Sequence, residues 1–129
     1  MSRRSVANAL SVIKNAIIHG KKEVVIRGQY SKLLMSILEI MKREGYLEDY
    51  ELISDEKGGE IKVVLSDTLN ECKAIMPRFF VKSDEYLEEE KRYLPAVNTG
   101  IIIVSTSKGL MTHKEAKGKY GGALIAYVY

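Results

Sequence analysis

The sequence is poor in cysteine, histidine, proline and tryptophan, and these shortages exclude several kinds of site. Its 129 residues include one cysteine, two prolines, two histidines and no tryptophan. One cysteine cannot form an intrachain disulfide, and neither His19 nor His113 has metal-ligand spacing to the other or to Cys72. We therefore expect no disulfide, no metal and no other cofactor, and we expect both histidines at surface or capping positions.

Long apolar runs are also absent. No uninterrupted apolar segment approaches the roughly 18 residues that span a bilayer, and the start of the chain has no continuous apolar signal core. These absences predict a soluble protein of the cytoplasm, where reducing conditions suit a single cysteine.

Motifs for nucleotide binding or catalysis are scarce. Neither Gly-x-x-x-x-Gly-Lys nor Gly-x-Gly-x-x-Gly occurs, so no nucleotide-cradling loop is predicted. Ser105 and Lys108 match Ser-x-x-Lys, the nucleophile-and-base spacing of some serine acyl-enzymes. The accompanying Ser-Asp-Asn and Lys-Thr-Gly motifs are missing, however, and a chain this short leaves little material for a substrate pocket. We predict that the protein is not an enzyme.

The charges that are present are unevenly distributed. Residues 1–43 contain nine Lys/Arg and two Asp/Glu, residues 44–90 contain five and fourteen, and residues 91–129 contain six and one. The corresponding net charges are +7, −9 and +5, which sum to the +3 of the whole chain. Basic ends that shared one side of the fold would present a positive face to phosphates. Chance and solvated helix faces would also explain the pattern.

Hydrophobic spacing predicts two helices and a strand at the start of the chain. Apolar residues recur at helical spacing between Ser5, a candidate N-cap, and Gly20, a candidate stop. They also line one side of a second segment between Ser31, again a candidate N-cap, and Gly45. A β-branched run over residues 23–26 lies between the helices and predicts a strand.

Two further strands are predicted after the second helix. They cover residues 50–53 and 61–65, and the glycines in the intervening segment 55–59 can adopt the positive φ of a hairpin turn. Residues 66–71 are polar, so we place a boundary there between an N-terminal subdomain, residues 1–66, and a C-terminal subdomain, residues 67–129.

The second subdomain begins with an extended segment and an acidic helix. The extended segment covers residues 73–81 and is interrupted by Pro77, which suits a sheet edge or a bend. The helix covers residues 84–93 and ends before Pro95. Consecutive helical residues point in different directions, so we interpret Glu88-Glu89-Glu90 as a solvated face rather than a metal site.

A buried strand and a closing strand are expected near the C-terminus. Residues 101–104 form the most apolar run and have the β-branching of a strand buried on both faces. Thr112 and Glu115 have the spacing of a capping box that opens a short helix. The Gly121-Gly122 pair then precedes a strand over residues 123–129.

The segment Ser105-Thr106-Ser107-Lys108-Gly109 follows the buried strand as a predicted loop. Hydroxyl and backbone N–H groups can bond phosphates, 2′-hydroxyls or base edges, and the lysine adds positive charge. The segment is therefore a candidate nucleic-acid contact. The alternative is a Ser/Thr-rich turn that caps the next helix.

Two residues outside this segment have types that suit RNA. Lys117 lies among lysines near Tyr120, and a mixture of cations and aromatic rings is typical of nucleic-acid surfaces. Tyr93 follows two basic residues and is the tyrosine that we most expect at the surface, where its ring could stack on an unpaired base.

The C-terminal pattern resembles that of a ribosomal protein family. Residues 105–112, then Glu115-Ala116, Gly121-Gly122 and an apolar strand ending in tyrosine are similar to the signature of small-subunit ribosomal protein family eight. Further matches cover nearly the whole chain in order: Val6-Ala-Asn-Ala-Leu10, Asn15-Ala16, Ser31-Lys32, Gly45-Tyr46-Leu47 and Pro77-Arg78-Phe79. Residues 91–96, Lys-Arg-Tyr-Leu-Pro-Ala, resemble the archaeal and eukaryotic branch.

The resemblance implies an α+β fold of two subdomains in a layered helix/sheet/sheet/helix arrangement. The N-terminal subdomain would be αβαββ, and the C-terminal one mostly β with short helices. It also implies a structural component of the small ribosomal subunit that binds the central domain of the rRNA directly and supports its assembly. The implied partners are this rRNA and neighbouring ribosomal proteins, with no membrane and no small-molecule substrate.

The resemblance also implies which residues bind RNA. In the C-terminal subdomain these are Ser105, Thr106, Ser107 and Lys108, with Gly121 and Gly122 allowing close approach of the RNA. In the N-terminal subdomain they are Asn8, Asn15, Ser31 and Lys32. Two positions differ from the family: Arg4-Ser5 replaces an Asp-Pro pair, and Ala123 replaces a glutamate of bacterial members. Contacts attributed to those positions are not carried over.

Two other functions stay open on the sequence. A protein of this family could repress translation of an mRNA that copies its rRNA site. From a different class, the acidic middle of the chain and the apolar strand edges would suit a protein-interaction module.

Overall fold

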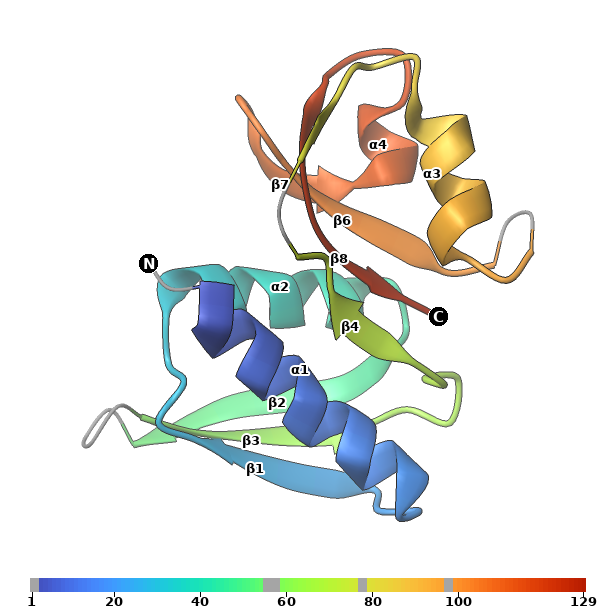
Figure 1. Ribbon diagram of the computed structural model, residues 1–129. Helices are drawn as coiled ribbons and strands as arrows, with labels where there is room; N and C mark the ends of the chain where they lie inside the picture. The colour runs from blue at the N-terminus through green and yellow to red at the C-terminus, as the bar shows by residue number, and fades with distance from the viewer. Residues whose placement is uncertain (1–2, 55–58, 77–78, 97–98) are drawn as a thin grey trace. The chain divides into compact units, whose positions relative to one another are not determined.

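The computed structural model describes residues 3–54, 59–76, 79–96 and 99–129. The chain divides into two compact units, Met1–Lys73 and Ala74–Tyr129 (Figure 1). Both contain helices packed on antiparallel strands, so the predicted α+β class is confirmed. The boundary after residue 66 stays a prediction. No helix within the described ranges has both the length and the apolar character needed to cross a membrane.

The first unit has the predicted order of elements, which are α1 (Arg3–Ile18), β1 (Glu23–Arg27), α2 (Lys32–Arg43), β2 (Leu47–Ser54) and β3 (Glu60–Leu65). α2 begins as predicted, because the Ser31 hydroxyl accepts a hydrogen bond from the Leu34 N–H at 3.1 Å. Gly45, with φ +88°, ends it. Ser5 is not an N-cap, so that prediction is wrong. α1 starts two residues earlier, because arginines favour the helical conformation without extending its apolar stripe.

The three strands form one antiparallel sheet in the order β1-β3-β2. α1 and α2 cover one face of this sheet (Figure 1). The strands bury apolar side chains on that face, among them Ile26, Ile61 and Val63. Most of the predicted turn, residues 55–58, lies outside the described residues, whereas Gly59 has the expected positive φ of +87°.

The rest of the chain forms β4 (Cys72–Ala74), β5 (Phe80–Val81), α3 (Tyr86–Tyr93), β6 (Ile101–Thr106), β7 (Gly109–Thr112), α4 (His113–Ala116) and β8 (Gly122–Val128). The sheet has the order β4-β8-β6-β7, with β5 also paired to β8. α3 and α4 lie over one face of β6 and β8 (Figure 1), where Tyr86, Val104 and Leu124 form part of the core. The predicted capping box is present, because the Thr112 and Glu115 side chains each bond the other residue's backbone N–H.

Three predictions for this unit are corrected by the structure. The segment 105–109 is not a loop, because Ser105 and Thr106 complete β6 and Gly109 opens β7. The residues of β7, Gly-Leu-Met-Thr, lack the apolar/polar alternation that marks a strand, so their pattern does not predict β7. The predicted extended segment 73–81 is present as β4 and β5 but begins one residue earlier, at Cys72, and Pro77 lies outside the described residues. α3 begins at Tyr86 rather than at residue 84.

Candidate nucleic-acid interface

The β6–β7 hairpin is closed by the side chain of Thr106. Its hydroxyl donates a hydrogen bond to the Gly109 carbonyl at 2.9 Å and accepts one from the Lys108 N–H at 3.1 Å. Gly109 has φ +106°, which residues with a side chain rarely adopt. The local sequence therefore fixes the turn, and the Thr106 hydroxyl is engaged in it. The RNA contact of Thr106 stays a prediction.

Ser105, Ser107 and Lys108 have exposed side chains on this hairpin. Within the described ranges, neither serine hydroxyl has a hydrogen-bond partner in the protein. Because the turn is already fixed, a ligand that bonded these hydroxyls would have to order only two short side chains. The arrangement can bind hydrogen-bonding groups and an anion side by side.

Gly121 and Gly122 lie beside this hairpin, because β8 pairs Ala123 with Ser105. A Cβ added to Gly122 would come within 2.4 Å of the Ser105 carbonyl oxygen. A Cβ added to Gly121 would come within 2.7 Å of the Val81 carbonyl oxygen. Both glycines are thus required for close approach of strands within the protein. Their predicted role in admitting RNA stays a prediction.

Lys117 belongs to a different part of the unit. It ends α4, which packs with Val104 on one face of the sheet, whereas alternation along β6 directs Ser105 to the other face. Lys117 Nζ lies 3.5 Å from Glu90 Oε1. The structure therefore does not group Lys117 with the hairpin, and a phosphate contact at Lys117 would be a separate one.

His113 is buried, so its predicted surface or capping position is wrong. Its side chain is 1% exposed. Nδ1 accepts a hydrogen bond from the Ile102 N–H at 3.0 Å, and Nε2 lies 3.1 Å from Glu90 Oε1. Burial lowers the pKa of His113 more than Glu90 raises it, which favours the neutral ring at pH 7. Because Nδ1 accepts a hydrogen bond, Nε2 carries the proton of the neutral ring and donates a hydrogen bond to Glu90.

The acidic run of α3 is only partly solvated. Glu88 is exposed as predicted, but Glu89 is only 6% exposed and its Oε1 lies 3.5 Å from Arg92 Nη1. Glu90 lies between His113 and Lys117. The prediction of a wholly solvated face is therefore wrong, because the helix directs two of the three carboxylates toward partners. No cluster of three potential metal ligands occurs in the described part of the chain.

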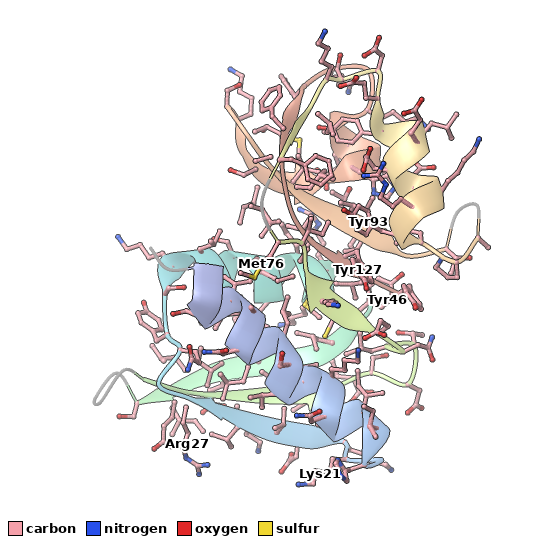
Figure 2. All side chains as sticks on the ribbon, in the orientation of Figure 1. Lys21, Arg27, Tyr46, Met76, Tyr93 and Tyr127 are labelled. Atoms are coloured by element: carbon pink, nitrogen blue, oxygen red, sulfur yellow. The ribbon has the colours of Figure 1, made fainter. Side chains whose placement is uncertain are left out.

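Tyr93 is half-buried and lies away from the hairpin. Its ring stacks on that of Tyr127, with centroids 5.4 Å apart; Figure 2 labels both residues. Tyr127 in turn stacks on Tyr129, with centroids 6.1 Å apart. Tyr127 pairs with Ile102 near the start of β6, whereas Ser107 follows the end of that strand. The expectation that Tyr93 stands at the surface is thus only partly met, since its ring is engaged with another tyrosine.

The candidate residues of the first unit lie on two helices. Asn8 and Asn15 are exposed on α1, and Ser11, which sequence analysis did not single out, is exposed between them on the same helix face. The helical period alone would have found it. At the start of α2, Lys32 is exposed, whereas the Ser31 hydroxyl serves as the N-cap.

Comparison with known proteins identifies the family. The family described as Ribosomal protein S8 matches residues 4–129. The small ribosomal subunit protein uS8 of Archaeoglobus fulgidus is 46% identical over 130 aligned positions that cover all of both chains. The uS8 protein of Nanoarchaeum equitans is 48% identical with the same coverage, and both organisms agree with the predicted archaeal-type branch. The chain therefore belongs to the ribosomal protein S8 family, as its C-terminal signature predicted.

Proposed function

We propose that this protein binds the central domain of the small-subunit rRNA directly and supports its assembly. Membership of the ribosomal protein S8 family supports its role as a structural, non-catalytic component of the small ribosomal subunit, with rRNA and neighbouring ribosomal proteins as partners. The observation that carries direct RNA binding is the β6–β7 hairpin. It presents two exposed serines and a lysine on a turn that Thr106 holds closed.

The groups on this hairpin suit different parts of an RNA. Ser105 and Ser107 can donate to and accept from 2′-hydroxyls and base edges. An irregular helix exposes base edges that the deep, narrow major groove of regular A-form RNA hides. Lys108 suits a phosphate. The phosphate contacts would set affinity and salt dependence, while the serines would select the irregular site.

The face of α1 that carries Asn8, Ser11 and Asn15 supports a second contact. The 16 residues of α1 contain no carboxylate, and its polar face offers two amides and a hydroxyl. Lys21 and Lys22 follow the helix with exposed side chains (Figure 2 labels Lys21). A face without negative charge does not repel phosphates, so this helix suits a second RNA element.

Binding of the purified protein to the isolated central-domain rRNA helix and to a random RNA, across a salt series, tests this proposal. We expect tight binding to the rRNA helix that persists at physiological salt, and weaker, salt-labile binding to the random RNA. Equal, salt-labile binding to both RNAs would mean that the hairpin does not select a site, and the proposal would fail.

A further inference from the structure

Phe80 is an exposed aromatic residue that no sequence pattern singles out. Its side chain is 70% exposed, the largest fraction among the large apolar side chains that the structure describes. It lies on β5, a strand of two residues whose other member, Val81, is buried. A single exposed apolar side chain is common on protein surfaces, so the significance of Phe80 depends on what lies beside it.

The strand register places Phe80 on the same face as the serine of the candidate site. Phe80 pairs with Ala123, Ala123 pairs with Ser105, and Ser105 pairs with Leu110. Directly opposed residues of antiparallel strands project from the same face. Phe80 and Ser105 are therefore two strands apart, about 10 Å, and only the methyl group of Ala123 stands between them.

Gly121 supports the ring of Phe80. A Cβ on Gly121 would lie 3.2 Å from Phe80 Cζ, so the tip of the ring occupies the space that a side chain at this position would need. Gly121 does not have a positive φ, which means that space rather than backbone conformation favours glycine there. The ring thus rests against backbone on one side and remains open to solvent on the other.

We infer that the exposed ring of Phe80 is a stacking platform for an unpaired base of the RNA bound at Ser105. This inference rests on the proposed function and names a contact within it. The row Phe80, Ala123, Ser105 and Leu110 contains no charge. Two exposed lysines flank the row in sequence: Lys82 lies two positions after Phe80, and Lys119 lies two positions before Gly121. A flat uncharged surface flanked by cations is the composition that binds single-stranded bases.

Substitution of Phe80 in the full-length protein tests the inference. Phe80→Leu keeps an apolar side chain but removes the π face, and Phe80→Tyr keeps the ring. Base stacking on an aromatic side chain contributes roughly 5- to 150-fold in affinity. We expect a loss in this range for Phe80→Leu on the central-domain rRNA helix, little loss for Phe80→Tyr, and no change in the salt slope, because the ring carries no charge.

Leu87→Ala provides the matched control, because Leu87 is also an exposed apolar residue of this unit, 49% exposed, but lies on α3. It should bind the rRNA helix as the wild type does. An equal denaturation midpoint for Phe80→Leu and wild type would show that the exposed substitution leaves folding intact. A second measurement places 2-aminopurine at each unpaired adenine of the helix. The wild type should quench the 2-aminopurine fluorescence at one position, and Phe80→Leu should abolish this quenching. That position would identify the stacked base.

Three results would overturn the inference. If the wild type selects the rRNA helix and Phe80→Leu binds it equally well, the stacking contact is absent while the proposed function stands. If the wild type does not select the helix, the proposed function and the inference fail together. If Phe80→Leu keeps full RNA affinity but is lost from reconstituted small subunits, the ring contacts a protein instead of a base.

Discussion

Both sheets are antiparallel and carry helices on one face, but the faces turned away from the helices differ. In the first unit, the strand pairing places Glu23, Val64 and Asp49 in one row of that face, and Val25, Lys62 and Glu51 in the next. In the second unit, the corresponding row is Phe80, Ala123, Ser105 and Leu110. One face is charged and the other is neutral, aromatic and hydroxyl-bearing.

Charges on the first face are partly neutralised within the protein. Lys62 Nζ lies 3.6 Å from Glu23 Oε2, and Arg27 Nε lies 3.9 Å from Glu60 Oε1. Such exposed ion pairs contribute little to stability but keep the face solvated. The row Phe80, Ala123, Ser105 and Leu110 on the second face has no charge to keep hydrated, so a ligand covers this row at a smaller desolvation cost. We therefore expect RNA recognition on this row of the second sheet, whereas the charges of the first sheet favour solubility.

The largest effect is expected from Gly122→Ala, which breaks the strand packing behind the second face. The new Cβ would meet the Ser105 carbonyl oxygen at 2.4 Å, and we expect a loss of about 3 kcal/mol in the free energy of unfolding. Gly45→Ala in the first unit is the control. It has φ +88° and nothing within 4 Å of its missing Cβ, so the expected cost is only about 1 kcal/mol. Urea unfolding monitored by circular dichroism measures both, and equal costs would contradict the packing argument.

Ser105→Ala should remove selectivity without affecting folding. A hydroxyl that bonds an otherwise unsatisfied group of the RNA is worth about 1–3 kcal/mol, or roughly 5- to 150-fold in affinity for the rRNA helix. Affinity for random RNA should not change, and Ser107→Ala is expected to act in the same way. On the charged face, Glu51→Gln should leave both affinities as they are. Filter binding at physiological salt distinguishes the two faces, and equal losses of Ser105→Ala on both RNAs would refute its reading role.

We expect an effect of intermediate size on the pH dependence of the free energy of unfolding, which the two histidines, one in each unit, allow to be compared. The pKa of His113 is lowered in the folded protein, chiefly by burial. Above the unfolded pKa of about 6.5 both states are neutral, so His113 adds no pH dependence. Below it the unfolded state binds the proton first, and stability falls by up to about 1.4 kcal/mol per pH unit until the folded pKa is reached.

Urea unfolding at pH 7.5 and 5.5 tests this expectation. His113→Gln should remove most of the loss at low pH, whereas His19→Gln, which changes an exposed ring, should retain it. NMR titration of the His113 ring in the wild type gives an independent reading that needs no variant. A ring that titrates above 6.5 would reverse the sign of the effect and contradict the burial argument.

The parts of this fold that the sequence predicts are those fixed by local or periodic patterns. The apolar period predicts α1 and α2, β-branching predicts β1 and β6, and the spacing of Thr112 and Glu115 predicts their capping box. The burial of His113 depends instead on packing against α3, which no neighbouring residue indicates. The face that carries Phe80 depends on register, and a slip of one residue would turn the ring into the core.

The candidate site shows the same division. The Ser-Thr-Ser-Lys segment is recognised because its residues are adjacent in sequence and resemble a family signature. The different roles of its hydroxyl residues cannot be predicted from the sequence. Thr106 closes the turn, while its two serine neighbours remain exposed. Hydroxyl groups at adjacent positions thus have different roles, and only the folded hairpin shows which hydroxyl has which role. Lys117 and Tyr93 are candidates for RNA contact by residue type alone, and the structure places both of them away from the hairpin.

The smallest expected effect concerns the salt dependence that single lysines contribute to RNA binding. Lys108 is exposed at the hairpin turn, and if it contacts a phosphate, Lys108→Ala should reduce the salt slope of log affinity by about 0.7–0.9 on cognate and random RNA alike. Lys117→Ala should act in the same way if Lys117 also contacts a phosphate. Lys62 is paired with Glu23 on the charged face, so Lys62→Ala should leave the slope unchanged. A slope that changes for Lys62→Ala but not for Lys108→Ala would place the RNA on the first sheet and reverse the comparison.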